Sequence, residues 1–171
     1  MTSTAAPSSP TTAVETTAAA TTAPPTPRVL RAGEVLGVPF GTPESEALSR
    51  LTEILGSPSE PTATALGGGV GNYRTFGSLT VLFFESTLGA GDRTLSGWLV
   101  DAPDGSWITD TGIAPGSTEA AVLSAYPAAT VTNEDECGNA PFVLGDEIEF
   151  SLDPAGSRTV DGIGSPWYGF C

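Results

Sequence analysis

The chain of 171 residues carries 20 acidic side chains against six arginines and has neither lysine nor histidine, so its formal net charge at pH 7 is −14. This charge repels nucleic-acid phosphates and anionic membrane surfaces, and we therefore exclude nucleic acid as an expected partner. The absence of histidine and lysine removes the commonest general bases and nucleophile activators, so we expect no enzymatic activity and no cofactor.

Residues 1–33 are predicted to form a disordered tether. The first 27 residues contain only Thr, Ala, Pro and Ser apart from Met1, Val14 and Glu15, and so few apolar side chains cannot offset the conformational entropy lost on folding. An extended chain of this length reaches about 80 Å. Such tethers often follow a signal peptide or a lipid-anchor cysteine, so we expect an extracytoplasmic, secreted or surface-tethered monomer that contacts a membrane only through such a segment. The alternative is a cytosolic protein with a frayed tail.

Residues 34–108 are predicted to be the first half of a single domain, with one helix followed by antiparallel strands. In PFGTPESEALSRLTEILGSP, Thr42 is the expected N-cap, Pro43 the first helical residue and Gly56 the C-terminal stop. Strands are expected at 73–78, 79–86, 93–101 and 106–111. The Gly-rich stretch 66–74 has neither the lysine nor the following helix of a phosphate-binding loop, so we interpret it as a connection.

Residues 109–171 are predicted to repeat this plan. Ser117 is the expected N-cap of a second helix, Glu119 lies in its first turn and Pro127 ends it. Strands are expected in ATVTN, APFVL, DEIEFSL and RTVDGI, and the alternation in DEIEFSL is typical of a strand with one wet and one buried face. The expected fold class is α+β, a tandem repeat of a helix followed by an antiparallel β-meander, with the helices on one face of the sheet.

Two short stretches match each other, since AGDRTLSG at 90–97 and AGSRTVDG at 155–162 share five of eight residues. We interpret them as equivalent turn-to-strand transitions, one in each half. Gly97 and Gly162 are expected to mark bulges or close backbone contacts. The alternative is that the arginines of these stretches bind a ligand carboxylate or pair with nearby acids.

The helical segments carry a family resemblance. GSTEAAVLSAYP at 116–127 resembles the short helical signature of the β-lactamase-inhibitor-protein and small outer-membrane lipoprotein fold, and GT at 41–42 with LGSP at 55–58 is similar. The resemblance implies one curved sheet with helices on one side and a partner-binding face on the other. Those inhibitors tend to have a disulfide in each half, whereas here only the second half has cysteines, so no individual contact residue is carried over.

Cys137 and Cys171 are expected to form a disulfide that fixes the C-terminal end. The closed loop of about 35 residues would stabilise the fold by roughly 4 kcal/mol if unstrained. Two free buried thiols are the alternative, and no metal site is expected because no histidine completes one. The acidic stretches 101–110 and 133–136 lack the spacing of a calcium loop, so we interpret them as solvated turns.

Aromatic and apolar strand residues define the candidate binding face. In LTVLFFE, apolar side chains point to both sides of one strand, and two helices cover one side only, so the other is expected to be a recognition surface. Its candidate residues are Tyr73, Leu82, Phe84, Trp98 and Trp107. We predict a non-enzymatic module that binds a protein or peptide, with an acidic rim that steers a basic partner. The alternatives are an envelope structural or assembly lipoprotein and a small hydrolase that uses a carboxylate pair.

Overall fold

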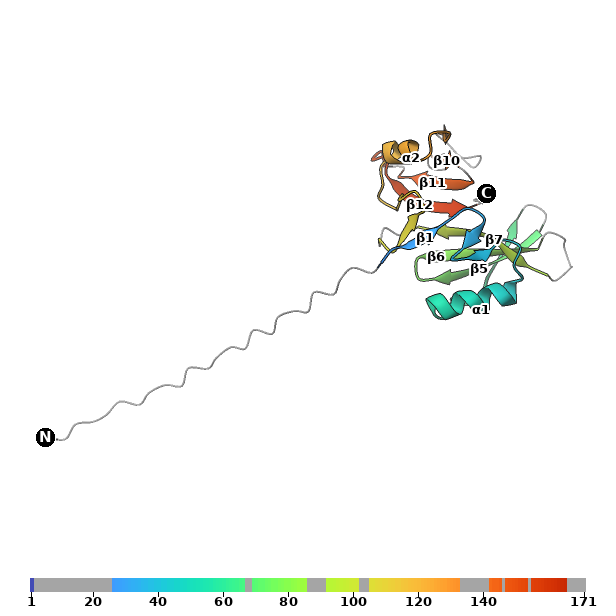
Figure 1. Ribbon diagram of the computed structural model, residues 1–171. Helices are drawn as coiled ribbons and strands as arrows, with labels where there is room; N and C mark the ends of the chain where they lie inside the picture. The colour runs from blue at the N-terminus through green and yellow to red at the C-terminus, as the bar shows by residue number, and fades with distance from the viewer. Residues whose placement is uncertain are drawn as a thin grey trace.

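The computed structural model describes residues 1, 26–66, 69–85, 92–101, 105–132, 142–145, 147–153 and 155–165. Most of the predicted tether, Cys137 and Cys171 lie outside these residues. The elements in chain order (Figure 1) are β1 (Arg28–Leu30), β2 (Glu34–Val35), β3 (Val38–Pro39), α1 (Glu44–Leu55), β4 (Thr62–Leu66), β5 (Gly69–Phe76), β6 (Leu79–Glu85), β7 (Thr94–Val100), β8 (Trp107–Thr109), α2 (Glu119–Ala125), β9 (Thr130–Thr132), β10 (Phe142–Gly145), β11 (Ile148–Leu152) and β12 (Val160–Ser165).

One eight-stranded sheet organises the fold. Its strand order is β4-β5-β6-β7-β12-β11-β10-β9, and every neighbouring pair in it is antiparallel. Two smaller sheets accompany it, a parallel pair of β1 and β8 and an antiparallel pair of β2 and β3. The pairing of β7 with β12 joins the early and the late strands into one continuous sheet.

One side of the sheet carries the core. Ala47 and Leu51 of α1 and Val122 of α2 are fully buried, and they belong to one cluster with Phe83 and Phe150 of the sheet. Figure 1 shows α1 beside β5 and α2 beside β10, at opposite ends of the sheet. The two helices therefore share one apolar core that extends across the sheet.

β1 brings part of the predicted tether into the fold. Arg28 lies opposite Trp107 in the parallel ladder with β8, and the Arg28 N–H donates to the Ser106 carbonyl at 2.8 Å. Leu30 is fully buried in the core. The described fold thus includes residues before position 34, where the sequence analysis placed the domain boundary.

Both helices begin one residue later than their sequence signals predict. The N-cap of α1 is Pro43, whose side chain has no group that can accept a hydrogen bond. The hydroxyl of Thr42, the predicted N-cap, donates to the Pro39 carbonyl at 2.7 Å. The N-cap of α2 is Thr118, whose hydroxyl accepts from the Ala121 N–H at 3.2 Å. The predicted C-terminal stop of α1 at Gly56 is confirmed, since its left-handed φ of 87° ends the helix.

The predicted α+β fold of two tandem helix-then-meander repeats is wrong. The protein is mostly β, with 47 % of it in strands and only two helices in the part that the structure describes. Two features of the sequence conceal the high strand content. The stretch read as a Gly-rich connection forms the hairpin of β4 and β5, with five consecutive residue pairs in register, and the segment before α1 contributes three further short strands.

The predicted role of the two matching glycines is confirmed. Leu82 pairs with Gly97 and Phe83 with Leu95, so the register of β6 and β7 shifts at Gly97. In the other half of the same sheet, the register of β11 and β12 shifts in the same way next to Gly162. Each glycine therefore lies at a β-bulge, where one strand carries an extra residue.

Candidate functional site

The register of the central strands assigns each side chain to one of two sheet faces. Directly opposite residues share a face, and successive residues alternate. Val81 pairs with Trp98 and Phe83 with Leu95, and all four side chains belong to the buried cluster under the helices. We call this side the core face, and the opposite side the open face.

Two of the five candidate binding residues lie in the core. Trp98 and Trp107 are each 2 % exposed. The Trp98 indole N–H donates to the Arg31 carbonyl, and the Trp107 indole N–H donates to the Ser78 hydroxyl, both at 3.0 Å. These bonds satisfy the polar end of each indole inside the protein, so neither tryptophan is part of the open face.

The other three candidates lie together on the open face. Tyr73 of β5 pairs with Leu82 of β6, and Phe84 follows two residues after Leu82 on the same side. Tyr73 and Phe84 are half-buried, and Leu82 is 6 % exposed. Burial raises the pKa of Tyr73 to about 12, so its hydroxyl stays protonated and neutral at physiological pH. The structure therefore gathers an apolar and aromatic cluster here, from strands that are adjacent in the sheet.

A row of paired residues extends the open face across the sheet. From β5 to β9 its members are Thr75, Thr80, Leu99, Gly164, Glu149, Leu144 and Thr130. Leu144 is 47 % exposed, a high value for a large apolar side chain in the middle of a strand. Leu99 of β7 and Leu144 of β10 are therefore the apolar side chains that this row adds to the open face.

The charge of the open face is acidic. Arg74, the one arginine in β5, lies opposite Val81 and so on the core face. The other arginines lie in β1, in α1 or in the segments that lead into strands. In the described strand residues of the open face Glu149 is charged and no side chain is basic.

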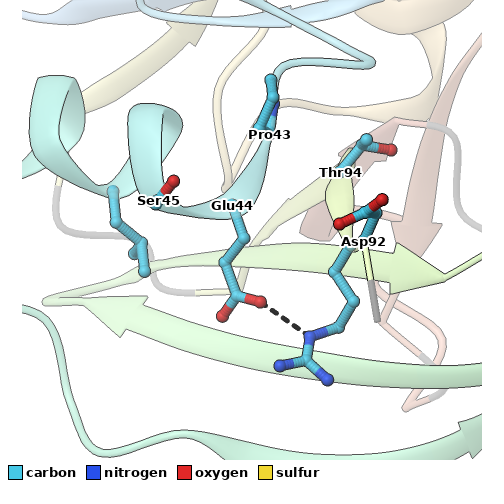
Figure 2. Close-up of a pocket in the computed structure, with 7 residues that line it drawn as sticks. Pro43, Glu44, Ser45, Asp92 and Thr94 are labelled. Carbon is cyan, nitrogen blue, oxygen red and sulfur yellow. Dashed lines mark hydrogen bonds and ion pairs between the residues drawn. The ribbon is translucent and has the colours of Figure 1, made fainter. Parts of the chain in front are cut away.

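A second site, which is polar, lies where α1 begins (Figure 2). A pocket of about 650 Å³ is lined by Pro43, Glu44, Ser45, Leu48, Asp92, Arg93 and Thr94. Arg93 Nε donates to Glu44 Oε2 at 2.7 Å, and Arg74 Nη2 lies 3.9 Å from Glu44 Oε1. In the amide orientation that satisfies its neighbours, the Asn72 oxygen accepts from Arg93 Nη2 at 3.0 Å.

These contacts hold the start of α1 on the sheet. The Glu44 N–H donates to the Arg93 carbonyl at 2.9 Å, and the Leu95 N–H donates to the Thr42 carbonyl at 2.8 Å. Figure 2 shows the Asp92 carboxylate on the other side of the pocket from that of Glu44, beside Thr94. Because both oxygens of Glu44 face arginines, we assign the pocket charges to structure rather than to acid–base chemistry.

The start of α2 repeats the backbone bond and the ion pair to the arginine that precedes the strand. The Glu119 N–H donates to the Arg158 carbonyl at 2.9 Å, and Arg158 Nε donates to Glu119 Oε2. The alternative that the arginines of the two matching stretches, Arg93 and Arg158, pair with nearby acids is therefore confirmed for the described residues. The similarity between the two stretches is local, since both lead into strands of one continuous sheet.

The described part of the chain contains no group of three or more His, Cys, Asp or Glu side chains placed to hold a metal ion. The acidic stretch 133–136 and residues 102–104 lie outside the described residues, as does the predicted disulfide. No helix among the described residues is long and apolar enough to cross a membrane.

No protein-family model, no curated protein and no solved structure matches this chain. The resemblance to the β-lactamase-inhibitor-protein fold therefore stays a prediction.

Sequence reasoning missed Leu99 and Leu144, which the sheet register adds to the open face. The alternation in FVLG and TLSGWLV gave no means of finding them, because which face is open depends on where the helices and β1–β3 pack.

Proposed function

We propose that this protein is a non-enzymatic binding module that recognises a basic surface of a protein or peptide through the open face of its sheet. The observation that carries the proposal is the gathering of Tyr73, Leu82 and Phe84 on the side of the sheet opposite α1 and α2. Partly exposed aromatic and apolar side chains of this kind supply the desolvated centre of an interface.

The charge of the chain supports a basic partner. A net charge of −14 with no lysine accelerates association with a cation-rich surface at low ionic strength. The Thr-, Ala- and Pro-rich residues 1–27 support the further proposal that the module is exported and tethered, since such a segment separates a binding domain from its anchor.

The test uses a displayed library of disulfide-closed loops of nine randomised residues, selected against the immobilised full chain. We expect enriched loops rich in Arg or Lys, with saturable binding that weakens at least tenfold for Phe84→Ala and also weakens as NaCl rises from 50 to 500 mM. The control is Ile54→Ala, which removes an equally apolar side chain that is 49 % exposed on α1. Binding that is insensitive to Phe84→Ala, or equally sensitive to Ile54→Ala, refutes the proposal.

A further inference from the structure

The pocket at the start of α1 holds a carboxylate that the fold leaves unpaired. Asp92 lines this pocket and is exposed, and within the described part of the chain its side chain has no ion pair or hydrogen bond. On the open face, by contrast, the charged residue among the described strand positions is Glu149, which already interacts within the protein. A basic partner therefore finds an available counter-charge in the pocket rather than at Glu149.

The other charged side chains that line the pocket are already paired. Arg93 Nε donates to Glu44 Oε2 at 2.7 Å, and Arg74, which also faces Glu44, does not line the pocket. Figure 2 shows the Asp92 carboxylate across the pocket from that of Glu44. An incoming cation would pair with Asp92, whereas an incoming anion would meet it as a like charge, so the pocket favours a cation.

The remaining lining narrows the kind of cation. The hydroxyls of Ser45 and Thr94 line the pocket, and neither has a hydrogen-bond partner among the described residues. Pro43 and Leu48 add apolar surface beside them. Arginine matches this lining, because its guanidinium has several N–H donors in one plane, can bond a carboxylate through parallel hydrogen bonds and ends an aliphatic stem.

The pocket adjoins the aromatic cluster of the open face. Thr94, which lines the pocket, pairs directly with Phe84 of β6. The Cβ atoms of directly opposite residues in an antiparallel pair are about 4.5–5.5 Å apart. One segment of a partner can therefore contact Phe84 and reach into the pocket at the same time.

We infer that the pocket at the start of α1 receives one arginine side chain of the partner. Its guanidinium pairs with the Asp92 carboxylate and donates to the hydroxyls of Ser45 and Thr94, and its stem lies against Leu48. This inference rests on the proposed function, and it adds where the partner's positive charge is bound.

The test uses the loops selected against the full chain and measures their binding to chain variants by titration. Asp92→Asn removes the charge and keeps the size of the side chain, and we expect it to weaken the loops about tenfold. The matched control is Asp101→Asn, which removes an equally exposed carboxylate at the other end of β7. Both variants change the net charge equally, so steering by the whole chain affects them alike. Circular dichroism and the urea midpoint verify that both fold.

A double-mutant cycle identifies the arginine. Each arginine of an enriched loop is replaced in turn by glutamine, and each product is titrated against the unchanged chain and the Asp92→Asn variant. We expect one arginine whose replacement removes the difference between the two chains. Its replacement by lysine should weaken binding to the unchanged chain about threefold, because an ammonium cannot make the parallel bonds.

The outcomes separate the two proposals. Loops that weaken for Phe84→Ala but bind Asp92→Asn as well as Asp101→Asn overturn the pocket inference and leave the proposed function standing. Enriched loops without arginine, or with no arginine coupled to Asp92, also overturn the inference. Loops that weaken for Asp92→Asn alone overturn the proposed open-face site and keep the pocket. Loops that ignore both Phe84→Ala and Asp92→Asn, or a selection that enriches nothing, overturn both proposals.

Discussion

Replacing Glu44 by Gln should destabilise the fold more than any other single carboxylate-to-amide change at the described ion pairs. Glutamine keeps the shape of the side chain and an oxygen that can accept from Arg93 Nε, so the change removes the charge and little else. Arg74 and Arg93 then remain as two like charges beside the start of α1 without a counter-ion.

The magnitude follows from the burial of the group. The side chains of Glu44, Arg74 and Arg93 are 15 %, 20 % and 29 % exposed. Removing one partner of a fully buried pair costs about 3–5 kcal/mol, and an exposed pair contributes about 0.2–1 kcal/mol. Since this cluster lies between these limits, we expect Glu44→Gln to lower the free energy of unfolding by about 2 kcal/mol.

The assay is urea unfolding of the full chain at pH 7, followed by tryptophan fluorescence. Glu46→Gln is the matched control, because Glu46 pairs with Arg50 on the same helix at 2.7 Å but both side chains are at least half exposed. It should cost no more than about 0.5 kcal/mol. Glu119→Gln should lie between the two, because the Glu119–Arg158 pair is more exposed than the Glu44 cluster and includes a single arginine. If Glu44→Gln costs no more than Glu46→Gln, the cluster does not stabilise the start of α1.

Two further predictions concern packing and pH. Gly145→Ala should lower the free energy of unfolding by about 1–3 kcal/mol through its clash with Tyr126, whereas Gly162→Ala, whose Cβ would meet nothing nearer than 3.6 Å, should leave the urea midpoint nearly unchanged. Equal midpoints for the two variants would contradict a clash at position 145. Asp161 is exposed as a residue, but partial desolvation of its carboxyl group raises its pKa above the ordinary 3.8. Its folded pKa is therefore higher than its unfolded one, and its ionisation increasingly disfavours the folded state as pH rises from below 3.8 through the folded pKa. Asp161→Asn should accordingly raise the melting temperature at pH 7 and have little effect at pH 3. The gain at pH 7 should exceed that of the control Asp110→Asn, which removes one charge from an exposed turn. The same gain at both pH values, or from both variants, would argue against a desolvated carboxyl group at Asp161.

Local signals predicted much of the secondary structure. Apolar spacing between proline and glycine located α1, and the alternation in β11 is confirmed, with Ile148, Phe150 and Leu152 buried and Glu149 and Ser151 half-buried between them. The hairpin of β4 and β5 was missed because a run of glycines carries no alternation and reads as a loop. The pairing of β7 with β12, which makes one sheet of the chain, has no local signal.

The placement of the tryptophans shows why the candidate face was only partly predictable. Simple alternation from buried Leu95 would place Trp98 on the open face, and the bulge at Gly97 reverses the alternation and turns Trp98 into the core. The sequence suggested a bulge at this glycine but not the resulting change of face. Likewise, the pairing of Glu44 with Arg93 joins residues 49 positions apart, which no local pattern specifies.

The parallel pairing of β1 with β8 has a mechanical consequence. Any tension applied through residues ahead of Arg28 enters the protein along β1, where it is resisted by the ladder with β8 and by the burial of Leu30. The hydrogen bond from the Trp98 indole N–H to the Arg31 carbonyl connects the end of β1 to β7, so part of the tension would pass through it to the central sheet. A pull applied at Arg28 would therefore be transmitted through β1 into the sheet that bears the open face.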